Sequence, residues 1–205
     1  MRARFETALI VILLVAAGTL SACDRDQTRQ GVPTQPKSVI SGPPPAETVR
    51  TCRTAVYGDP ASRRKALTAG PISLLVDRHA DVHPPKEVKA LVLIRAGEKV
   101  TLVIPEDERN SLSLLYDFGP GPKHLLRLSD GTSSVRFNAC TSSQNWAQGQ
   151  PYPDADETQF NGGFFVRGAQ CATLEVWVEG QNDPALLELE FGMGGRPCPA
   201  DSSGA

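Results

Sequence analysis

A short stretch of alternating acidic and imidazole side chains has the residue types that metal chemistry needs. Asp77, His79, Asp81 and His83 occupy every second position. In an extended chain such positions share one face, and carboxylates and imidazoles together can hold zinc or another transition metal. Two prolines follow directly, so we expect a loop, in which polar titratable residues are ordinary. We therefore predict no metal and no cofactor, and keep these four residues as the candidates for a metal site or a metal-dependent hydrolase.

The longest irregular stretch of the expected domain, residues 141–159, carries aromatic and acidic side chains together. Trp146 and Tyr152 could stack on a sugar ring while Asp154 and Asp156 hydrogen-bond its hydroxyls, which would make the loop a carbohydrate-binding site. The two aspartates could also hold calcium, although their spacing fits no complete EF-hand loop. We favour a third interpretation, a surface insertion whose Trp146 packs back onto the domain.

Trp177 is the other unusual aromatic residue. It falls on the outward face of an expected strand, between Glu175 and Glu179. Either the 141–159 loop covers it, or it marks a surface for a partner. We expect the loop to cover it, because burial is the commoner fate of tryptophan.

No complete catalytic motif occurs in the sequence. Ser62 and Lys65 match the S-x-x-K pattern of penicillin-recognising enzymes, but the K-T-G element that this chemistry also needs is absent. The sequence has no G-x-S-x-G, no H-E-x-x-H and no phosphate-binding loop, so we predict no catalytic residues and no enzyme. The formal net charge is −2. This balance lacks the positive field that attracts nucleic acid, so we expect no nucleic-acid partner.

The most nucleophilic side chain near the N-terminus is the thiol of Cys23, at the end of the sequence Leu20-Ser21-Ala22-Cys23. Before it runs an apolar stretch, residues 8–17, which as a helix would span about 15 Å, a length that suits a signal peptide and is short for a transmembrane helix. The motif resembles the lipobox of bacterial lipoproteins. The resemblance implies a signal peptide over residues 1–22, acylation of Cys23 with palmitate-like chains, and anchoring in the cell membrane on its extracytoplasmic face.

Composition divides the rest of the chain into three parts. Residues 23–48 are rich in proline and poor in apolar residues, so we expect a disordered tether. Residues 49–200 are long enough for one domain with a core, and residues 201–205 are an expected disordered tail.

Short alternating runs dominate the domain. Val135, Phe137 and Ala139 form one inward-facing set, and Leu187, Leu189 and Phe191 form another. Residues 88–95 and 98–104 flank Ala96-Gly97, which is a hairpin signal. The remaining expected strands are residues 71–77, 111–116, 124–129, 134–139, 163–167, 173–179 and 185–191, and only residues 60–68 and 105–109 favour a helical turn. About nine short strands with regular turns indicate an all-β fold, a single antiparallel β-sandwich.

Four cysteines remain beyond Cys23, and an even number in an exported chain predicts disulfides. Cys140 closes one expected strand and Cys171 opens another, so we predict that they meet across a sheet end. Cys52 and Cys198 stand near the two ends of the domain, and because domain termini often lie close together we predict that they pair.

Segments of the C-terminal half, among them "TQFNGGFFVRGAQC" and "LEVWVEG", resemble uncharacterised lipoproteins or secreted β-rich proteins of high-GC Gram-positive bacteria. That family supplies no catalytic residues. We therefore expect a membrane-anchored envelope lipoprotein whose domain is a non-catalytic binding or structural module for a cell-wall or envelope protein partner. The alternative is a carbohydrate-binding module that uses the 141–159 loop.

Overall fold

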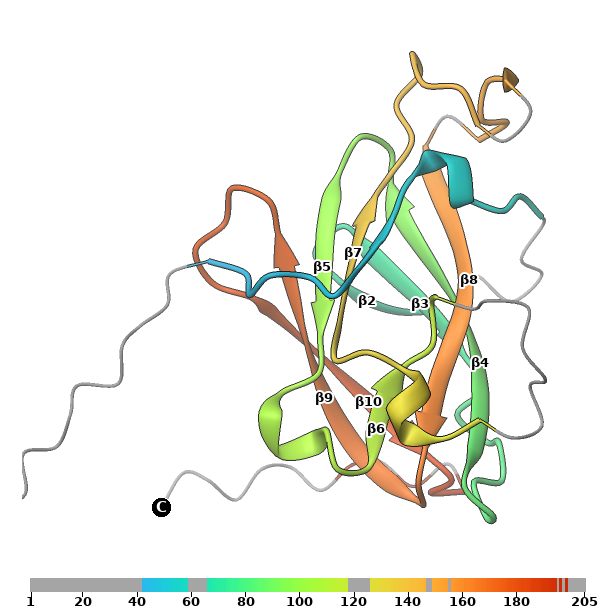
Figure 1. Cartoon of the computed structure of the whole chain (residues 1–205), viewed down its shortest axis with the longest axis vertical. Coiled ribbons are helices and arrows are strands. Elements are labelled where there is room, and N and C mark those ends of the chain that lie inside the picture. Colours follow the sequence, from blue (N-terminus) through green and yellow to red (C-terminus); the bar gives the residue numbers. More distant parts are fainter. Residues whose placement is uncertain are drawn as a thin grey trace, which may run out of the picture. The chain divides into compact units, whose positions relative to one another are not determined.

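The computed structural model describes residues 42–58, 66–117, 126–146, 149–154, 156–194, 196 and 198. These residues form ten strands in two five-stranded sheets, and they include no α-helix (Figure 1). The predicted all-β fold of two packed sheets is confirmed. The signal peptide, Cys23, the first part of the tether and the tail of residues 201–205 lie outside the described residues.

The first sheet contains both the first and the last strand of the domain, in the order β1-β7-β5-β9-β10. Its strands are β1 (Thr48–Arg50), β5 (Lys99–Val103), β7 (Ser134–Asn138), β9 (Gln170–Val178) and β10 (Ala185–Phe191). Neighbouring strands are antiparallel except β1 and β7, which run parallel. The parallel pair brings the residues that follow both strands to the same end of the sandwich.

The second sheet has the order β2-β3-β4-β8-β6, and all its pairs are antiparallel. Its strands are β2 (Leu67–Ala69), β3 (Ile72–Val76), β4 (Lys86–Arg95), β6 (Leu112–Leu114) and β8 (Glu157–Val166). The ten-residue strands β4 and β8 pair along their whole length and form the centre of this sheet.

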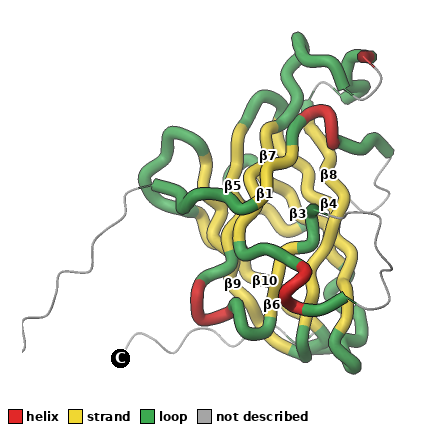
Figure 2. The backbone as a smooth tube through the Cα atoms, in the orientation of Figure 1, coloured by secondary structure: helices red, strands yellow, loops and turns green. Residues whose placement is uncertain are grey.

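Three short 3₁₀ helices whose residues are all described lie in the connections, and they are among the segments drawn in red in Figure 2. They are η1 (Cys52–Thr54), η3 (Glu106–Glu108) and η5 (Leu128–Asp130). η3 confirms the predicted helical turn at 105–109. The strand predicted at 124–129 is wrong over its described part, because residues 128–130 form η5 instead.

Alternating side chains meet between the sheets as the sequence predicted. Phe137 of β7 and Leu189 of β10 are fully buried, as are the other members of their inward-facing sets. The ring of Phe137 lies 5.2 Å from that of Phe160 on β8, so aromatic packing joins the two sheets. Tyr116, just after β6, packs edge-on against Phe137 with 5.1 Å between ring centres.

The turn at Ala96-Gly97 does not close a hairpin. β4 belongs to the second sheet and β5 to the first, so the chain changes sheets at this turn. Gly97 has a φ of 78°, which suits glycine, and its backbone N–H donates to the carbonyl oxygen of Cys140 at 2.8 Å. The prediction of a hairpin was wrong because the turn signal is local, whereas the pairing partners of both strands lie far along the chain.

Both predicted disulfide pairings are wrong. The disulfides are Cys52–Cys140 and Cys171–Cys198. β7 and β9 each pair with β5 in the antiparallel sense, so they run parallel to one another with β5 between them. The end of β7 and the start of β9 therefore lie at opposite ends of the sheet, which keeps Cys140 away from Cys171. Cys52 reaches Cys140 instead, because each cysteine follows one strand of the parallel pair β1 and β7.

The domain begins before the predicted boundary at residue 49. Thr48 already lies in β1, and the backbone N–H of Glu47 donates to Ser134 Oγ at 3.0 Å. That hydroxyl also donates to the carbonyl oxygen of Pro45, at 3.3 Å. Residues 45–48, which the sequence assigned to the tether, are therefore part of the folded domain.

Candidate functional site

The aromatic side chains of the loop after β7 fold back onto the domain. Trp146 Nε1 donates to the carbonyl oxygen of Ala55 at 2.7 Å, and Tyr152 Oη donates to that of Val56 at 2.7 Å. Tyr152 Oη also accepts the backbone N–H of Gln159, at 2.9 Å. The favoured interpretation of this loop, an insertion that packs back through Trp146, is confirmed. Its predicted end at residue 159 is wrong, since β8 already begins at Glu157.

One of the two aspartates of this loop, Asp154, binds the loop's own backbone. Asp154 Oδ1 accepts the backbone N–H groups of Asp156 at 2.9 Å and of Glu157 at 3.2 Å, which fixes the turn into β8. Among the described residues, no group of three or more histidine, cysteine, aspartate or glutamate side chains gathers to hold a metal ion. Neither the calcium alternative nor the zinc alternative gains geometric support.

The stretch from Asp77 to His83 forms a loop between β3 and β4, as its position before the two prolines suggested. Asp77 Oδ1 accepts the backbone N–H of His79 at 3.1 Å, and Asp81 Oδ1 accepts that of His83 at 3.0 Å. Each carboxylate thus closes a local turn. The chain turns here instead of extending, and no three of these four side chains gather to hold a metal ion.

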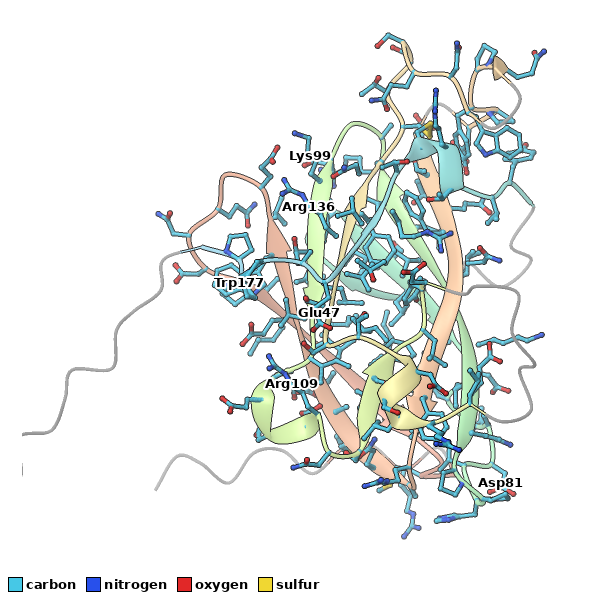
Figure 3. The ribbon with its side chains drawn as sticks, viewed as in Figure 1. Glu47, Asp81, Lys99, Arg109, Arg136 and Trp177 are labelled. Carbon is cyan, nitrogen blue, oxygen red and sulfur yellow. A yellow bond between two sulfur atoms is a disulfide. The ribbon has the colours of Figure 1, made fainter. Side chains whose placement is uncertain are left out.

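Trp177 lies on the outer face of the first sheet, opposite Thr101 of β5. Its Nε1 donates to Glu175 Oε2 at 2.8 Å. Trp177 projects from β9, away from the end of the sandwich where the loop after β7 lies (Figures 1 and 3). The expectation that this loop covers Trp177 was therefore wrong, and the side chain stays half-buried on an open sheet face.

A charged cluster lies beside Trp177 on the same face. Glu179 forms an ion pair with Lys99 at 2.8 Å and contacts Arg136 as well (Figure 3). The hydrogen bond from Lys99 is the largest cause that lowers the pKa of Glu179. The cluster pairs its own charges and is about half exposed to solvent, so it is a solvated part of the sheet and not a site for a charged ligand.

A polar pocket of about 440 Å³ lies at the end of the sandwich beside the Cys52–Cys140 disulfide. We call it the amide pocket. Its described lining residues are Thr51, Cys52, Arg53, Asn138, Gln144 and Asn145. They come from η1, from the end of β7 and from the loop after β7. The parallel pairing of β1 and β7 is what brings these three segments together.

Hydrogen-bonding capacity remains open in the amide pocket. Asn138 Oδ1 is buried and has no hydrogen-bond partner among the described residues. Gln144 Oε1 accepts the backbone N–H of Thr141 at 3.2 Å, which leaves its amide NH₂ group to donate. Arg53 and Asn145 are exposed at the rim. A buried acceptor without a partner costs free energy, and this one belongs to a residue in the wall of the pocket.

Arg50 holds the η1 wall of this pocket in place. Its Nε donates to Thr54 Oγ1 at 3.0 Å, its Nη2 donates to the carbonyl oxygen of Thr54 at 2.9 Å, and its Nη1 donates to that of Tyr116. Burial lowers the pKa of Arg50, and the carboxylate of Asp117 acts in the opposite direction. The guanidinium group ties the edges of the two sheets to η1, so the pocket is preformed.

One exposed aromatic side chain lies near this end of the molecule. Tyr57 is 55% exposed and meets the ring of Tyr152 edge-on, with 6.2 Å between ring centres. Trp146 meets the other side of Tyr152 at 5.6 Å. Tyr57 is the member of this aromatic row whose ring is open to a ligand.

None of the lining residues of the amide pocket was predicted individually as a binding residue, although the candidate binding loop, residues 141–159, includes two of them. A polar run within the predicted loop contains Gln144 and Asn145, and it was the one signal that pointed there. Thr51 and Arg53 reach the site only because β1 pairs with a strand more than eighty residues away.

The two disulfides indicate a domain that matures in an oxidising, extracytoplasmic compartment. Within the described residues, no helix combines the length and apolar character needed to cross a bilayer. Comparison with known protein families, curated proteins and solved structures finds no match to this chain.

Proposed function

We propose that the chain is a lipoprotein, anchored through Cys23 at the extracytoplasmic face of the cell membrane, whose β-sandwich is a non-catalytic module that binds a cell-wall or envelope protein partner. The lipobox-like sequence Leu20–Cys23 and the two disulfides support this location. The amide pocket is the observation that carries the binding role. It is preformed and lined by amide, hydroxyl and guanidinium groups, and Asn138 in its wall has a buried acceptor without a partner among the described residues.

The anchor is tested by fractionation of cells that express the full chain. We expect the wild-type protein with the membranes, and we expect Cys23→Ala to be released or left with its signal peptide attached. Ser21→Ala, a change to another small residue, is the matched control and should leave the protein membrane-bound. Wild-type protein found in the medium with an unmodified Cys23 would exclude the anchor.

A carbohydrate ligand is the second candidate, and the chemistry of the amide pocket favours it. Amide and guanidinium groups match the alternating donors and acceptors of sugar hydroxyls, and Tyr57 offers a ring on which a sugar could stack. The aromatic residues of the loop that the sequence suggested for this role, Trp146 and Tyr152, contribute packing instead.

Binding variants separate the two candidates. We expect Asn145→Ala and Gln144→Ala each to weaken ligand binding about three- to tenfold, because each change removes a hydrogen-bonding group. Asn161→Ala, an exposed asparagine on β8 outside the pocket, is the matched control. The variants are compared on a glycan array and in capture of purified envelope proteins. A loss of binding by the pocket variants on the glycan array supports a sugar ligand, and a loss in protein capture supports a protein partner. If Asn161→Ala lost as much binding as the pocket variants in both assays, the amide pocket would be excluded as the site.

A further inference from the structure

A second pocket, of about 690 Å³, is lined by three arginines. We call it the arginine pocket. Arg109 follows η3, Arg127 precedes η5, and Arg167 follows β8. Three segments that are distant in the sequence therefore bring cationic side chains to one depression, in a chain whose net charge is negative.

The fold holds these segments together through backbone contacts. The backbone N–H of Arg167 donates to the carbonyl oxygen of Ser111 at 2.9 Å, and its Nη1 donates to that of Asn110 at 3.1 Å. Arg109 Nε donates to the carbonyl oxygen of Ile104 at 3.0 Å. These bonds use part of each guanidinium group and leave the other N–H groups available.

A close approach between η5 and β6 places Arg127. Gly131 lies so near β6 that a Cβ atom there would come within 2.3 Å of Ser113 Oγ. Thr132 and Leu114 exchange backbone hydrogen bonds of 2.8 and 2.9 Å. Glycine at this position lets the turn lie directly on the strand, which brings Arg127 over the same sheet face that carries Phe165.

No carboxylate neutralises this cluster within the part of the chain that the structure describes. None of the described lining residues is acidic, and none of the three arginines forms an ion pair with another described residue. Two carboxylates lie near the pocket without lining it, and one of them, Glu87, is opposite Phe165 in the β4–β8 pairing. Asp130 Oδ2 accepts the backbone N–H of Arg127 at 2.7 Å, and Glu87 lines a separate groove on the second sheet.

The walls of the arginine pocket are partly apolar. Phe165 and Pro85 line it together with Leu128, and Ser129 adds a hydroxyl group. The pocket is larger than a single small anion requires and falls in the usual size range of small-molecule sites. Its lining thus combines a cationic region with an apolar surface.

We propose that the arginine pocket binds the phosphate group of a ligand that also carries an apolar portion. Guanidinium groups match phosphate oxygens with pairs of parallel hydrogen bonds. Three cationic groups suit a phosphate, with its three terminal oxygens and nearly two negative charges, better than a carboxylate with two oxygens and one charge. The apolar portion of the ligand would lie against Phe165 and Pro85. This site is separate from the amide pocket and does not depend on the function proposed for it.

Calorimetry on the full chain tests the proposal with phenyl phosphate, inorganic phosphate and benzoate as probes. We expect phenyl phosphate to bind most tightly, because it alone offers both a phosphate and an apolar ring. Arg127→Gln and Arg167→Gln should each weaken its binding about tenfold, the usual effect of losing a charge-assisted hydrogen bond. Arg95→Gln, which removes an exposed charge at the end of β4, is the matched control and should change little.

Three results would overturn the proposal: no binding of phenyl phosphate, benzoate binding as tightly as phenyl phosphate, or an equal loss in Arg95→Gln. Arg167→Lys adds a test that keeps the charge. We expect it to weaken binding as well, since lysine lacks the paired donors of arginine. Full retention of affinity would show that the site attracts anions only by its positive charge, and would contradict the proposed paired hydrogen bonds to a phosphate. Unchanged thermal midpoints show that the variants remain folded.

The phosphate could belong to a soluble ligand or to a lipid headgroup, and a vesicle assay separates the sources. The full chain and its Arg127→Gln/Arg167→Gln variant are sedimented with vesicles of phosphatidylcholine alone or with added phosphatidic acid. Any contribution of the lipid anchor is common to both proteins. A smaller gain from phosphatidic acid in the variant supports a headgroup ligand, whereas equal gains together with the calorimetric loss support a soluble phosphate ligand.

Discussion

The hydroxyl groups of Tyr116 and Tyr152 are both buried, but they differ in their hydrogen bonding. Tyr152 Oη donates one hydrogen bond and accepts another, whereas Tyr116 Oη has no partner. Burial raises the pKa of Tyr116 well above its usual value, so this hydroxyl stays neutral. A polar group without a partner in a core lowers stability, and a fully bonded one does not.

Replacing each tyrosine by phenylalanine should therefore change the unfolding free energy differently, with a loss of stability for one variant only. We expect Tyr152→Phe to cost about 1–3 kcal/mol of unfolding free energy, because the change leaves Val56 and Gln159 without their bonds. Tyr116→Phe should be neutral or stabilising, since only an unpaired hydroxyl is lost. Urea denaturation followed by tryptophan fluorescence measures both. A larger loss for Tyr116→Phe than for Tyr152→Phe would contradict this account of the core.

Residue-level chemistry was predictable only where it depended on near neighbours. The sequence suggested that Trp146 would pack back, because a tryptophan in a loop seldom stays in water. It gave no sign of Asn138, which alternates outward on β7 like any polar strand residue. Its place in a pocket follows from η1, which is fixed beside it by long-range pairing and a disulfide.

At the scale of elements, β8 is a strand whose first half could not be predicted from its sequence. Asn161-Gly162-Gly163 has the composition of a turn, and the predicted strand accordingly began at residue 163. The glycines serve close packing instead. A Cβ at Gly162 would lie 2.3 Å from Cδ1 of Tyr116, and one at Gly163 would lie 2.5 Å from the carbonyl oxygen of Val88. Strands with clear alternation, such as 134–139, were predicted correctly because their pattern needs no knowledge of their neighbours.

This packing makes Gly162 a position of low tolerance. We expect Gly162→Ala to lower the unfolding free energy by about 1–3 kcal/mol or more, because the added methyl group must displace the buried ring of Tyr116. Gly58→Ala is the control, since no atom lies within 4 Å of the new Cβ. That change should be neutral or stabilise by less than about 1 kcal/mol. Thermal and urea denaturation compare the two variants, and equal effects would show that the close approach is not present.

For the molecule as a whole, the two disulfides limit the conformational freedom of the unfolded chain to different extents. Cys52 and Cys140 are 88 residues apart, whereas Cys171 and Cys198 are 27 apart. Closing the longer loop removes more conformational entropy from the unfolded state. The longer link also joins the first strand of the domain to its middle, and the shorter one joins β9 to the chain that follows β10.

Removal of the Cys52–Cys140 disulfide should therefore lower the unfolding free energy more than removal of the Cys171–Cys198 disulfide. The chain-entropy relation gives about 4–5 kcal/mol for the Cys52→Ala/Cys140→Ala pair and about 3–4 kcal/mol for the Cys171→Ala/Cys198→Ala pair. Urea denaturation of the two double variants checks the order. Peptide mapping without reduction checks the pairing itself, and a peptide that links Cys140 to Cys171 would contradict the fold described above.

Both disulfides join cysteines that follow one another directly along the sequence. The residues of an exported domain enter the oxidising compartment in sequence order, so the thiol of Cys140 is the next to appear after that of Cys52 within the domain. Cys171 and Cys198 follow only later. Oxidation in the order of emergence therefore produces the native pairs at once, and no earlier bond has to be broken by exchange with a later thiol. The chain should mature with a simple thiol oxidant and without a disulfide isomerase.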